Sequence, residues 1–406
     1  MDKNVVLVTL DALRKDRIGI YNPEKELTPY IDRLAEKSVI FENCFTVSNT
    51  SAPSHTSILS GCYPMSHGLR RNGWKVNEST VFLSEVLKKQ GLRTVGAVSQ
   101  EMLTSTYNFN KGFDVFFDNS KMDKVMKKLS KIGTRKVNMR KIVQFFFVDT
   151  HSRAGKNTIA EVVNWVESNY KERFFLFMHL FDVHRDTFAE ENRGIELDEV
   201  KRYDENVSIV DKLFGRLLNS LEKLELMKNT MIIVMADHGE CLGEFRKKSH
   251  GYTLLDVEFK VPLIIYHPSL KPQRVRKMCR TIDVFPTTLE LAGIKEKRNI
   301  DGISLLSMIR GEEDVTEVFM EGGLNYLDIR GIRTKEWKYI IKNGKEEFLY
   351  DMNCDPDEKA NVKDKEKDVT IKLREKVKKH FECNENREQE TDEHTKKMLK
   401  KLGYLE

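Results

Sequence analysis

The chain has 406 residues, 40% of them hydrophobic, which fits one large α/β domain with an added piece, or two domains, and excludes global disorder. Its 68 Lys and Arg residues against 63 Asp and Glu residues give a net charge of only +5, which does not indicate a nucleic-acid partner. No segment approaches the roughly 18 uncharged apolar residues of a membrane-spanning helix, so we expect no membrane span. The start, MDKNVVLVTLD, lacks the pattern of a signal peptide, and we expect a cytoplasmic location.

The six cysteines are scattered and form no CxxC pair, so we expect them to be free, buried thiols.

Apolar runs that look like strands alternate with helical patterns along most of the chain. The expected strands are residues 4–11, 93–100, 173–184, 229–240 and 261–268. The expected helices are residues 28–39, 77–91, 157–172, 204–226 and 283–294. Continuous apolar strands separated by helices predict an α/β fold with a largely parallel sheet covered on both faces.

The pattern changes after residue 311, where short strands flank an Asn343-Gly344 turn. We predict a catalytic domain over residues 1–311 and a small antiparallel-sheet subdomain with a charged helical tail over residues 312–406. Residues 119–156 are basic and show no strand pattern. They are interpreted as an insertion near the rim of the site or as a surface helix.

Acidic and imidazole side chains follow three of the predicted strands. They are Asp11, then Asp182 and His184, then Asp237 and His238. Because the carboxyl ends of parallel strands form the ligand crevice of such a sheet, these residues are expected at the functional edge. Carboxylate oxygens with one imidazole suit a single divalent ion, Mg, Ca, Mn or Zn, so Asp11, Asp237 and His238 are the predicted metal ligands.

The stretch NTSAPSHTSILSG, residues 49–61, places Ser51 before an apolar helical turn. A hydroxyl there lies where the helix dipole and free amides favour an anion, and Ser51 can also serve as the further metal ligand. A metal ion would lower the pKa of this hydroxyl and activate it as a nucleophile. The same stretch is also typical of a capped helix, with Ser51 capping a helix over residues 54–60. A shift by one residue would make Thr50 the nucleophile instead.

A series of motifs runs along nearly the whole chain. In sequence order they are VTLDALRKDRIG, SAPSHTSILSG, HGLRRNG, VFLSEVLKKQGLRTVGAVS, KGFDVFFD, FLFMHLFDVH, ADHGECLGE, SHGYTLLDVEFKVPLIIY, DVFPTTLELAGI, DGISLL and YDMNCDPDEKAN. With these motifs in this order, the chain resembles the sulfatase family of the alkaline phosphatase superfamily. The resemblance implies a large mixed, mostly parallel sheet flanked by helices, with a small C-terminal α+β subdomain. It also implies metal-dependent hydrolysis of the sulfate ester of a small anionic substrate, a sulfated or phosphorylated alcohol or sugar.

The resemblance assigns a role to each motif residue. The metal ligands are Asp11, Asp237, His238 and Ser51. Ser51 falls on the nucleophile position, which sulfatases oxidise to formylglycine. The other catalytic candidates are His184 facing the leaving group, His250 beside the transferred group, and His55 at the signature's Arg position. The substrate-binding candidate that the resemblance gives is Asn72. Arg14, as a possible anion contact, and Asp182, from its place at a strand end, are further substrate-binding candidates from the residues themselves. His179, deeper in its strand, is equally well explained as a core residue.

Two departures from the family pattern keep alternatives open. Ala12 stands where sulfatases have a second Asp, so Asp16 is the candidate replacement ligand. His55 stands where the signature for formylglycine conversion has Arg, so an unmodified Ser51 is the alternative nucleophile. The alternative functions are a phosphodiesterase or phosphonate monoester hydrolase, a transferase of phospho-alcohol groups, and a non-catalytic anion-binding protein. The sequence does not indicate the oligomeric state.

Overall fold

The computed structural model describes residues 3–118, 153–184, 197–244, 248–312, 314–324 and 327–382, together with residues 395, 396 and 399. Most of the predicted basic insertion, residues 119–152, lies outside the described residues. In the described ranges, no helix is long and apolar enough to cross a membrane.

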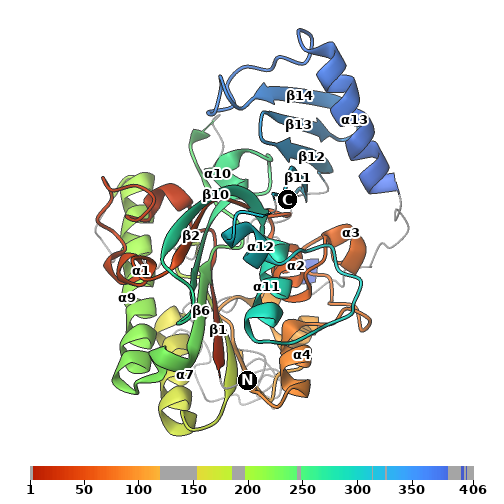
Figure 1. Cartoon of the computed structure of the whole chain (residues 1–406). Helices are drawn as coiled ribbons and strands as arrows, with labels where there is room; N and C mark the ends of the chain where they lie inside the picture. The colour runs from red at the N-terminus through yellow and green to blue at the C-terminus, as the bar shows by residue number, and fades with distance from the viewer. Residues whose placement is uncertain are drawn as a thin grey trace, which may run out of the picture.

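An eight-stranded sheet forms the centre of the molecule, in the order β10-β2-β9-β6-β1-β5-β3-β4 (Figure 1). Its strands are β1 (Asn4–Leu10), β2 (Val39–Phe45), β3 (Arg93–Ala97), β4 (Val115–Phe117), β5 (Phe174–Leu180), β6 (Thr230–Met235), β9 (Lys260–Tyr266) and β10 (Gln273–Arg280). Strand β9 pairs antiparallel with both of its neighbours, and the other pairs are parallel. The predicted mixed, mostly parallel α/β sheet is therefore confirmed.

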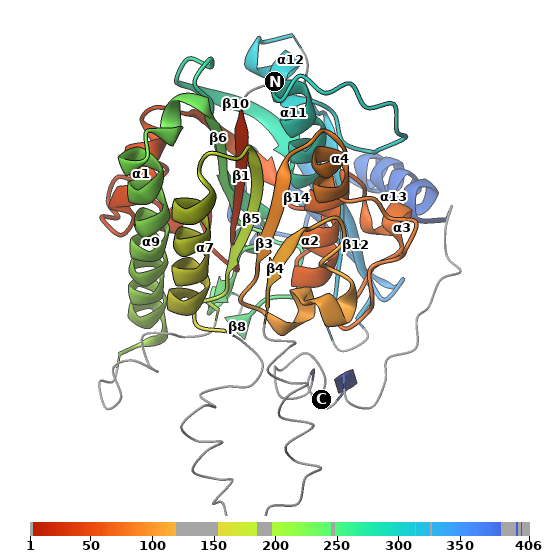
Figure 2. The same ribbon diagram turned by 90° about the horizontal axis from the view of Figure 1, so that it is seen from below.

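Helices cover both faces of the sheet, as continuous apolar strands require. Figure 2 shows α1 (Pro29–Ala35), α7 (Gly155–Asn169) and α9 (Glu199–Lys223) on one side, and α2 (Ser51–Ser60), α4 (Leu83–Lys89) and α11 (Val284–Leu291) on the other. Short helices α3 (Pro64–His67), α10 (Asp256–Phe259) and α12 (Leu305–Ile309) complete this part of the chain. Strand β1 is central, and all seven of its residues are buried.

Helix α2 is the element that matters most for the site, and all ten of its residues are buried. It begins at Ser51, so Thr50 is the N-cap residue and makes no side-chain capping bond. The predicted capping role of Ser51 is therefore wrong, because the helix starts three residues earlier than expected. The helix ends at Ser60, and the C-cap residue Gly61 has a φ of 72°, which suits glycine; a Cβ there would lie 3.0 Å from Phe285.

A second, four-stranded antiparallel sheet follows the large one, as the Asn-Gly turn predicts. It consists of β11 (Glu317–Gly322), β12 (Ile329–Thr334), β13 (Trp337–Lys342) and β14 (Glu346–Asp351), and α13 (Lys367–Glu382) packs on it (Figure 1). The fully buried Lys338 pairs with Asp256 and Glu358 and so joins this sheet to the segment before β9. The domain boundary at residue 311 stays a prediction.

Some local predictions were wrong. The helix expected over 77–91 starts only at Leu83, where the Phe82 amide donates to the Glu85 carboxylate at 2.9 Å and so caps the first turn. Strands β2, β4 and β10 were not predicted; the charged residues of QRVRKMCR in β10 hide its strand character. Among the five cysteines described, all are free, but Cys354 is exposed and Cys62 only half-buried.

Candidate active site

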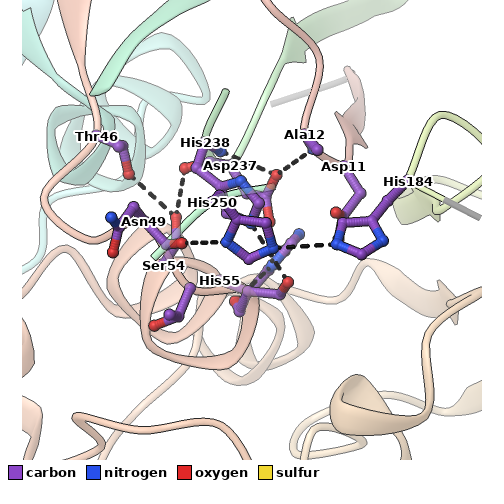
Figure 3. A network of polar contacts seen from close by, with 12 residues as sticks. Asp11, Ala12, Thr46, Asn49, Ser54, His55, His184, Asp237, His238 and His250 are labelled. Carbon is purple, nitrogen blue, oxygen red and sulfur yellow. Dashed lines mark hydrogen bonds and ion pairs between the residues drawn. The ribbon is translucent and has the colours of Figure 1, made fainter. Parts of the chain in front are cut away.

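Two acidic residues meet at the carboxyl ends of adjacent parallel strands. Thr9 of β1 pairs with Met235 of β6, so Asp11 and Asp237, each two residues further along, reach the same level. Both side chains are fully buried, as is His238. One ligand atom from each of Asp11, Asp237 and His238 lies within 4.8 Å of the others (Figure 3).

In each of the two carboxylates, one oxygen accepts hydrogen bonds from the protein and the other accepts none from the described residues. Asp237 Oδ1 accepts hydrogen bonds from the amides of His238, at 2.9 Å, and Ala12, at 3.2 Å. Ala12 adopts a left-handed conformation, φ 56°, which costs a non-glycine residue roughly 1 kcal/mol. Asp11 Oδ1 and Asp237 Oδ2 are buried and accept no hydrogen bond from any residue that the structure describes.

These free oxygens fit a bound cation. Burial raises the pKa of Asp11 to about 8 and that of Asp237 well above its usual range, the nearby Asp11 charge adding to the latter. A divalent ion between them would offset both penalties and let both groups ionise. His238 Nδ1 lies 2.9 Å from the Gly239 carbonyl, which only accepts, so the ring's lone pair is on Nε2. The cluster therefore has the composition and the tautomer of a divalent metal site.

Ser51 lies directly beside this cluster. Its Oγ is 3.4 Å from His238 Nε2, and its hydroxyl hydrogen-bonds to the Asp11 carboxylate, which lowers the pKa of that carboxyl against the larger effect of burial. Gln100 Nε2 donates to the same oxygen at 3.2 Å. Thr50, by contrast, contacts Ser48 Oγ at 3.3 Å. The structure therefore brings Ser51 together with the predicted ligands.

His184 and His250 form a pair beside the cluster. Their Nε2 atoms are 3.1 Å apart, and the His250 ring stacks on the His238 ring with centroids 4.0 Å apart (Figure 3). Burial lowers the pKa of His184 to about 4 and that of His250 to about 3, so both rings are neutral at pH 7.

His55 lies one helical turn after Ser51 and faces the interior. Its Nδ1 donates to the Ser51 carbonyl at 2.8 Å, which leaves Nε2 to accept from Thr9 Oγ1 at 2.9 Å. Nδ1 is also 3.5 Å from Asp237 Oδ2. Burial lowers its pKa well below the usual value. With both ring nitrogens engaged, His55 supports the backbone of the nucleophile, and its predicted catalytic role stays a prediction.

The predicted substrate-binding residues take different positions. Arg14 forms ion pairs with Asp16 and Glu244, so its charge is neutralised and Asp16 is held outside the metal cluster. Asp182 Oδ1 accepts from the Gly155 amide, at the start of α7. Asn72 Oδ1 accepts from the Ala52 amide at 2.9 Å, beside the nucleophile. Asn72 Nδ2 is buried and has no hydrogen-bond partner in the described ranges.

Two residues of the site were missed or left undecided by the sequence. His179 Nε2 lies 3.1 Å from Asp11 Oδ2, while the Ser99 amide donates to its Nδ1, so the ring donates to Asp11. The signal was its place directly beside Thr9 in the pairing of β1 with β5. Gln100 follows β3 at the same sheet edge. Because it carries no charge, it was not recognised from the sequence as a residue of the site.

The comparisons with known proteins agree with this geometry. A family model described as Sulfatase matches residues 3–294. The chain belongs to the sulfatase family. A model described as N-sulphoglucosamine sulphohydrolase, C-terminal, matches residues 250–385 of this sulfatase. The predicted family is confirmed, and the chain is a sulfate ester hydrolase of that family.

Relatives of this sulfatase cover most of its length. It is 23% identical to an ulvan-active sulfatase of Formosa agariphila, over 88% of this chain and 76% of that protein. It is also 23% identical to a delta 4,5-hexuronate-2-O-sulfatase of Bacteroides thetaiotaomicron, over 88% of this chain and 84% of that one. The solved phosphonate monoester hydrolase from Silicibacter pomeroyi superposes with a TM-score of 0.71 at 19% identity, over 94% and 96% of the two chains. This last likeness shows the fold alone.

Proposed function

We propose that this sulfatase hydrolyses the sulfate ester of a small sulfated alcohol or sugar at a single divalent metal ion, with residue 51 as the nucleophile. The observation that carries the proposal is the position of Ser51 Oγ, which contacts Asp11, His238 and Gln100 at once. The names of the relatives support a sugar substrate, because one acts on a 2-O-sulfated hexuronate.

The residues of the site divide the reaction among them. A divalent ion, held by Asp11, Asp237, His238 and Ser51, would supply Lewis-acid activation of the nucleophile and of the sulfate. The Ser51 side-chain oxygen attacks sulfur in line. The free Asn72 Nδ2 donates to a non-bridging oxygen of the sulfate. The sulfur–oxygen bond to the alcohol then breaks and its electron pair stays on that oxygen. His184 is neutral at pH 7 in the free protein, so it acts as the acid after taking up a proton in the substrate complex, where the anionic ester favours the charged ring, and it delivers that proton to the departing oxygen. The hydroxyl of residue 51 loses its own proton to solvent, which balances the step.

We further propose that a separate maturation enzyme, using an external two-electron oxidant, removes two hydrogens from the Ser51 side chain and converts it to formylglycine. Its aldehyde hydrate has a second hydroxyl that lets the enzyme-bound sulfate be expelled, which a plain serine sulfate ester lacks. The second candidate is an unmodified Ser51 that acts on phosphate diesters or phosphonate monoesters. It is favoured by His55, which stands where the signature for formylglycine conversion has Arg.

One pair of experiments tests the proposal. The purified protein is stripped with a chelator, reloaded with Mg, Ca, Mn or Zn, and assayed with aryl sulfate, phosphate diester and phosphonate monoester substrates. Mass spectrometry of the peptide containing residue 51 is done in parallel. Metal-dependent sulfate cleavage with a peptide two hydrogens lighter than the encoded sequence supports the proposal. Cleavage of phosphorus esters alone, with an unmodified peptide, favours the second candidate. A peptide with the formylglycine mass, together with no turnover of any of these substrates, would contradict both candidates.

A further inference from the structure

Tyr203 of α9 is buried and reaches the loop that follows β1. Its hydroxyl donates to the Ala12 carbonyl at 2.6 Å and accepts from the Arg14 amide at 2.9 Å. The direction of both bonds is fixed, because a carbonyl only accepts and an amide only donates. The hydroxyl therefore ties α9 to the residues that come directly after the metal ligand Asp11.

The bond to Ala12 restrains a residue in an unfavourable conformation. Ala12 has a φ of 56°, in the left-handed region that residues other than glycine seldom adopt. Its amide donates to Asp237 Oδ1 at 3.2 Å, and its carbonyl accepts from Tyr203. Since peptide groups are rigid planes, hydrogen bonds on both sides of the Ala12 Cα fix its φ and ψ. Tyr203 therefore helps to hold Ala12 in a conformation that local sterics disfavour.

This turn connects the two carboxylates of the metal cluster. Asp11 directly precedes Ala12, and its own amide donates to the Leu180 carbonyl at 2.9 Å. If Ala12 relaxed toward an extended conformation, its amide would turn away from Asp237 Oδ1, which would lose one of the two described amides that donate to it. The orientation of Asp237 relative to Asp11 would then be less restricted. Hydrogen bonds behind metal ligands are worth about 10- to 100-fold in metal affinity.

We propose that Tyr203 is a positioning residue of the divalent metal site: by holding Ala12 in its left-handed turn, it keeps the carboxylates of Asp11 and Asp237 in the arrangement that binds the ion. The hydroxyl acts through the backbone of residues 12–14 and takes no part in the chemical step. This inference rests on the metal site of the proposed function. It adds a residue from α9, a helix on the face of the sheet, to a site built at the ends of β1 and β6 (Figure 2).

The test removes only the hydroxyl, with Tyr203→Phe. Tyr21→Phe is the matched control, because the Tyr21 hydroxyl also donates to a carbonyl, at 2.9 Å, and accepts from an amide, at 3.1 Å, but both belong to Leu263 of β9. Each metal-free protein is titrated with Mg, Ca, Mn and Zn by calorimetry, which gives the Kd of the ion without any turnover. The melting temperature in chelator is measured beside it.

We expect Tyr203→Phe to raise the Kd of the ion by about 10- to 100-fold, and Tyr21→Phe to leave it within about threefold of wild type. Both variants lose one donor and one acceptor for the backbone, so their melting temperatures in chelator should fall by a similar few degrees. A purely structural role would give the two variants the same Kd. At saturating ion, kcat of Tyr203→Phe for an aryl sulfate should return to within about fivefold of wild type.

A second substitution tests the route through Ala12. Glycine adopts the left-handed conformation without the steric cost that alanine has, so the turn needs less restraint. Adding Ala12→Gly to Tyr203→Phe should therefore recover roughly tenfold of the lost affinity. Ala12→Val, with Tyr203 intact, should weaken metal binding, because a β-branched side chain opposes this conformation.

The outcomes separate this inference from the proposed function. Absence of metal binding in wild type would overturn the proposed metal site and the inference with it. Metal binding by wild type, with Tyr203→Phe within about threefold of it or no weaker than Tyr21→Phe, would overturn the role of Tyr203 alone. If Tyr203→Phe does not fold, Ala12→Val is the deciding variant, and an unchanged Kd there would overturn the inference.

Discussion

Replacing Asp11 by Asn should stabilise the metal-free protein and abolish the stabilisation by metal. In the metal-free chain Asp11 is fully buried, and burial raises its pKa from 3.8 to about 8. At pH 7 the folded chain keeps this group protonated while the unfolded chain ionises it, which costs the folded state up to about 4 kcal/mol. Asn has the same shape, keeps an oxygen for His179 Nε2, and carries no such cost.

The same pKa fixes the sign of the pH dependence. Between pH 3.8 and about 8 the folded protein binds more protons at Asp11 than the unfolded chain does. The metal-free wild type should therefore lose stability as pH rises through this window, and Asp11→Asn should lose less. A metal ion that binds the ionised pair offsets part of this cost, by about 2.7 kcal/mol at one hundred times its Kd.

The assay is chemical denaturation of both proteins at pH 5 and pH 7, with chelator and with each divalent ion. We expect Asp11→Asn to be at least as stable as wild type in chelator at pH 7, and to gain less than about 0.5 kcal/mol from any ion. Tyr339→Phe, a buried change in the small sheet, controls for general effects of core substitution. A variant clearly less stable than wild type in chelator, or one that gains as much from metal, would refute the reasoning.

Three further predictions concern single residues. Ser51→Ala should remove turnover and leave the melting temperature in chelator within a few degrees of wild type, checked by aryl sulfate assay and calorimetry; full activity would sink the nucleophile assignment. Gln100→Leu removes the donor to Ser51 Oγ and should lower kcat by about ten- to a hundredfold with metal binding retained, measured by steady-state kinetics and metal titration; a normal kcat would refute it. Lys338→Met removes the fully buried cation that pairs with the half-buried Asp256 and the buried Glu358, and leaves Asp256 only the more distant Arg333. It should cost about 3 to 5 kcal/mol in urea denaturation, and a cost below about 1 kcal/mol would contradict this account.

Most of the large sheet could be predicted because its central strands are continuous apolar runs. Strands β1, β5 and β6 are seven, seven and six residues long and entirely buried, so burial on both faces is visible in the sequence. Strand β10 could not be predicted, since its exposed residues are Gln and Arg and its partner β2 lies far away in the chain. Helix α4 was overextended because the hydrogen bond from the Phe82 amide to the Glu85 carboxylate sets its start.

For the site, strand ends were the useful signal. Asp11, Asp237 and His238 follow their strands directly, and the parallel register brings them together. The orientation of a side chain is not visible in the sequence, so Arg14 could be placed near the site but not recognised as neutralised by Asp16 and Glu244. Partners supplied from distant segments, such as Gln100 for Ser51, have no local pattern at all.

The most direct test of the central claim is the turnover of para-nitrophenyl sulfate by the metal-reconstituted protein, with Ser51→Ala measured beside it. The account predicts sulfate release that requires the added divalent ion, disappears with chelator, and is absent in Ser51→Ala. Sulfate release that survives chelation, or that persists in Ser51→Ala, would contradict a metal-dependent reaction at residue 51.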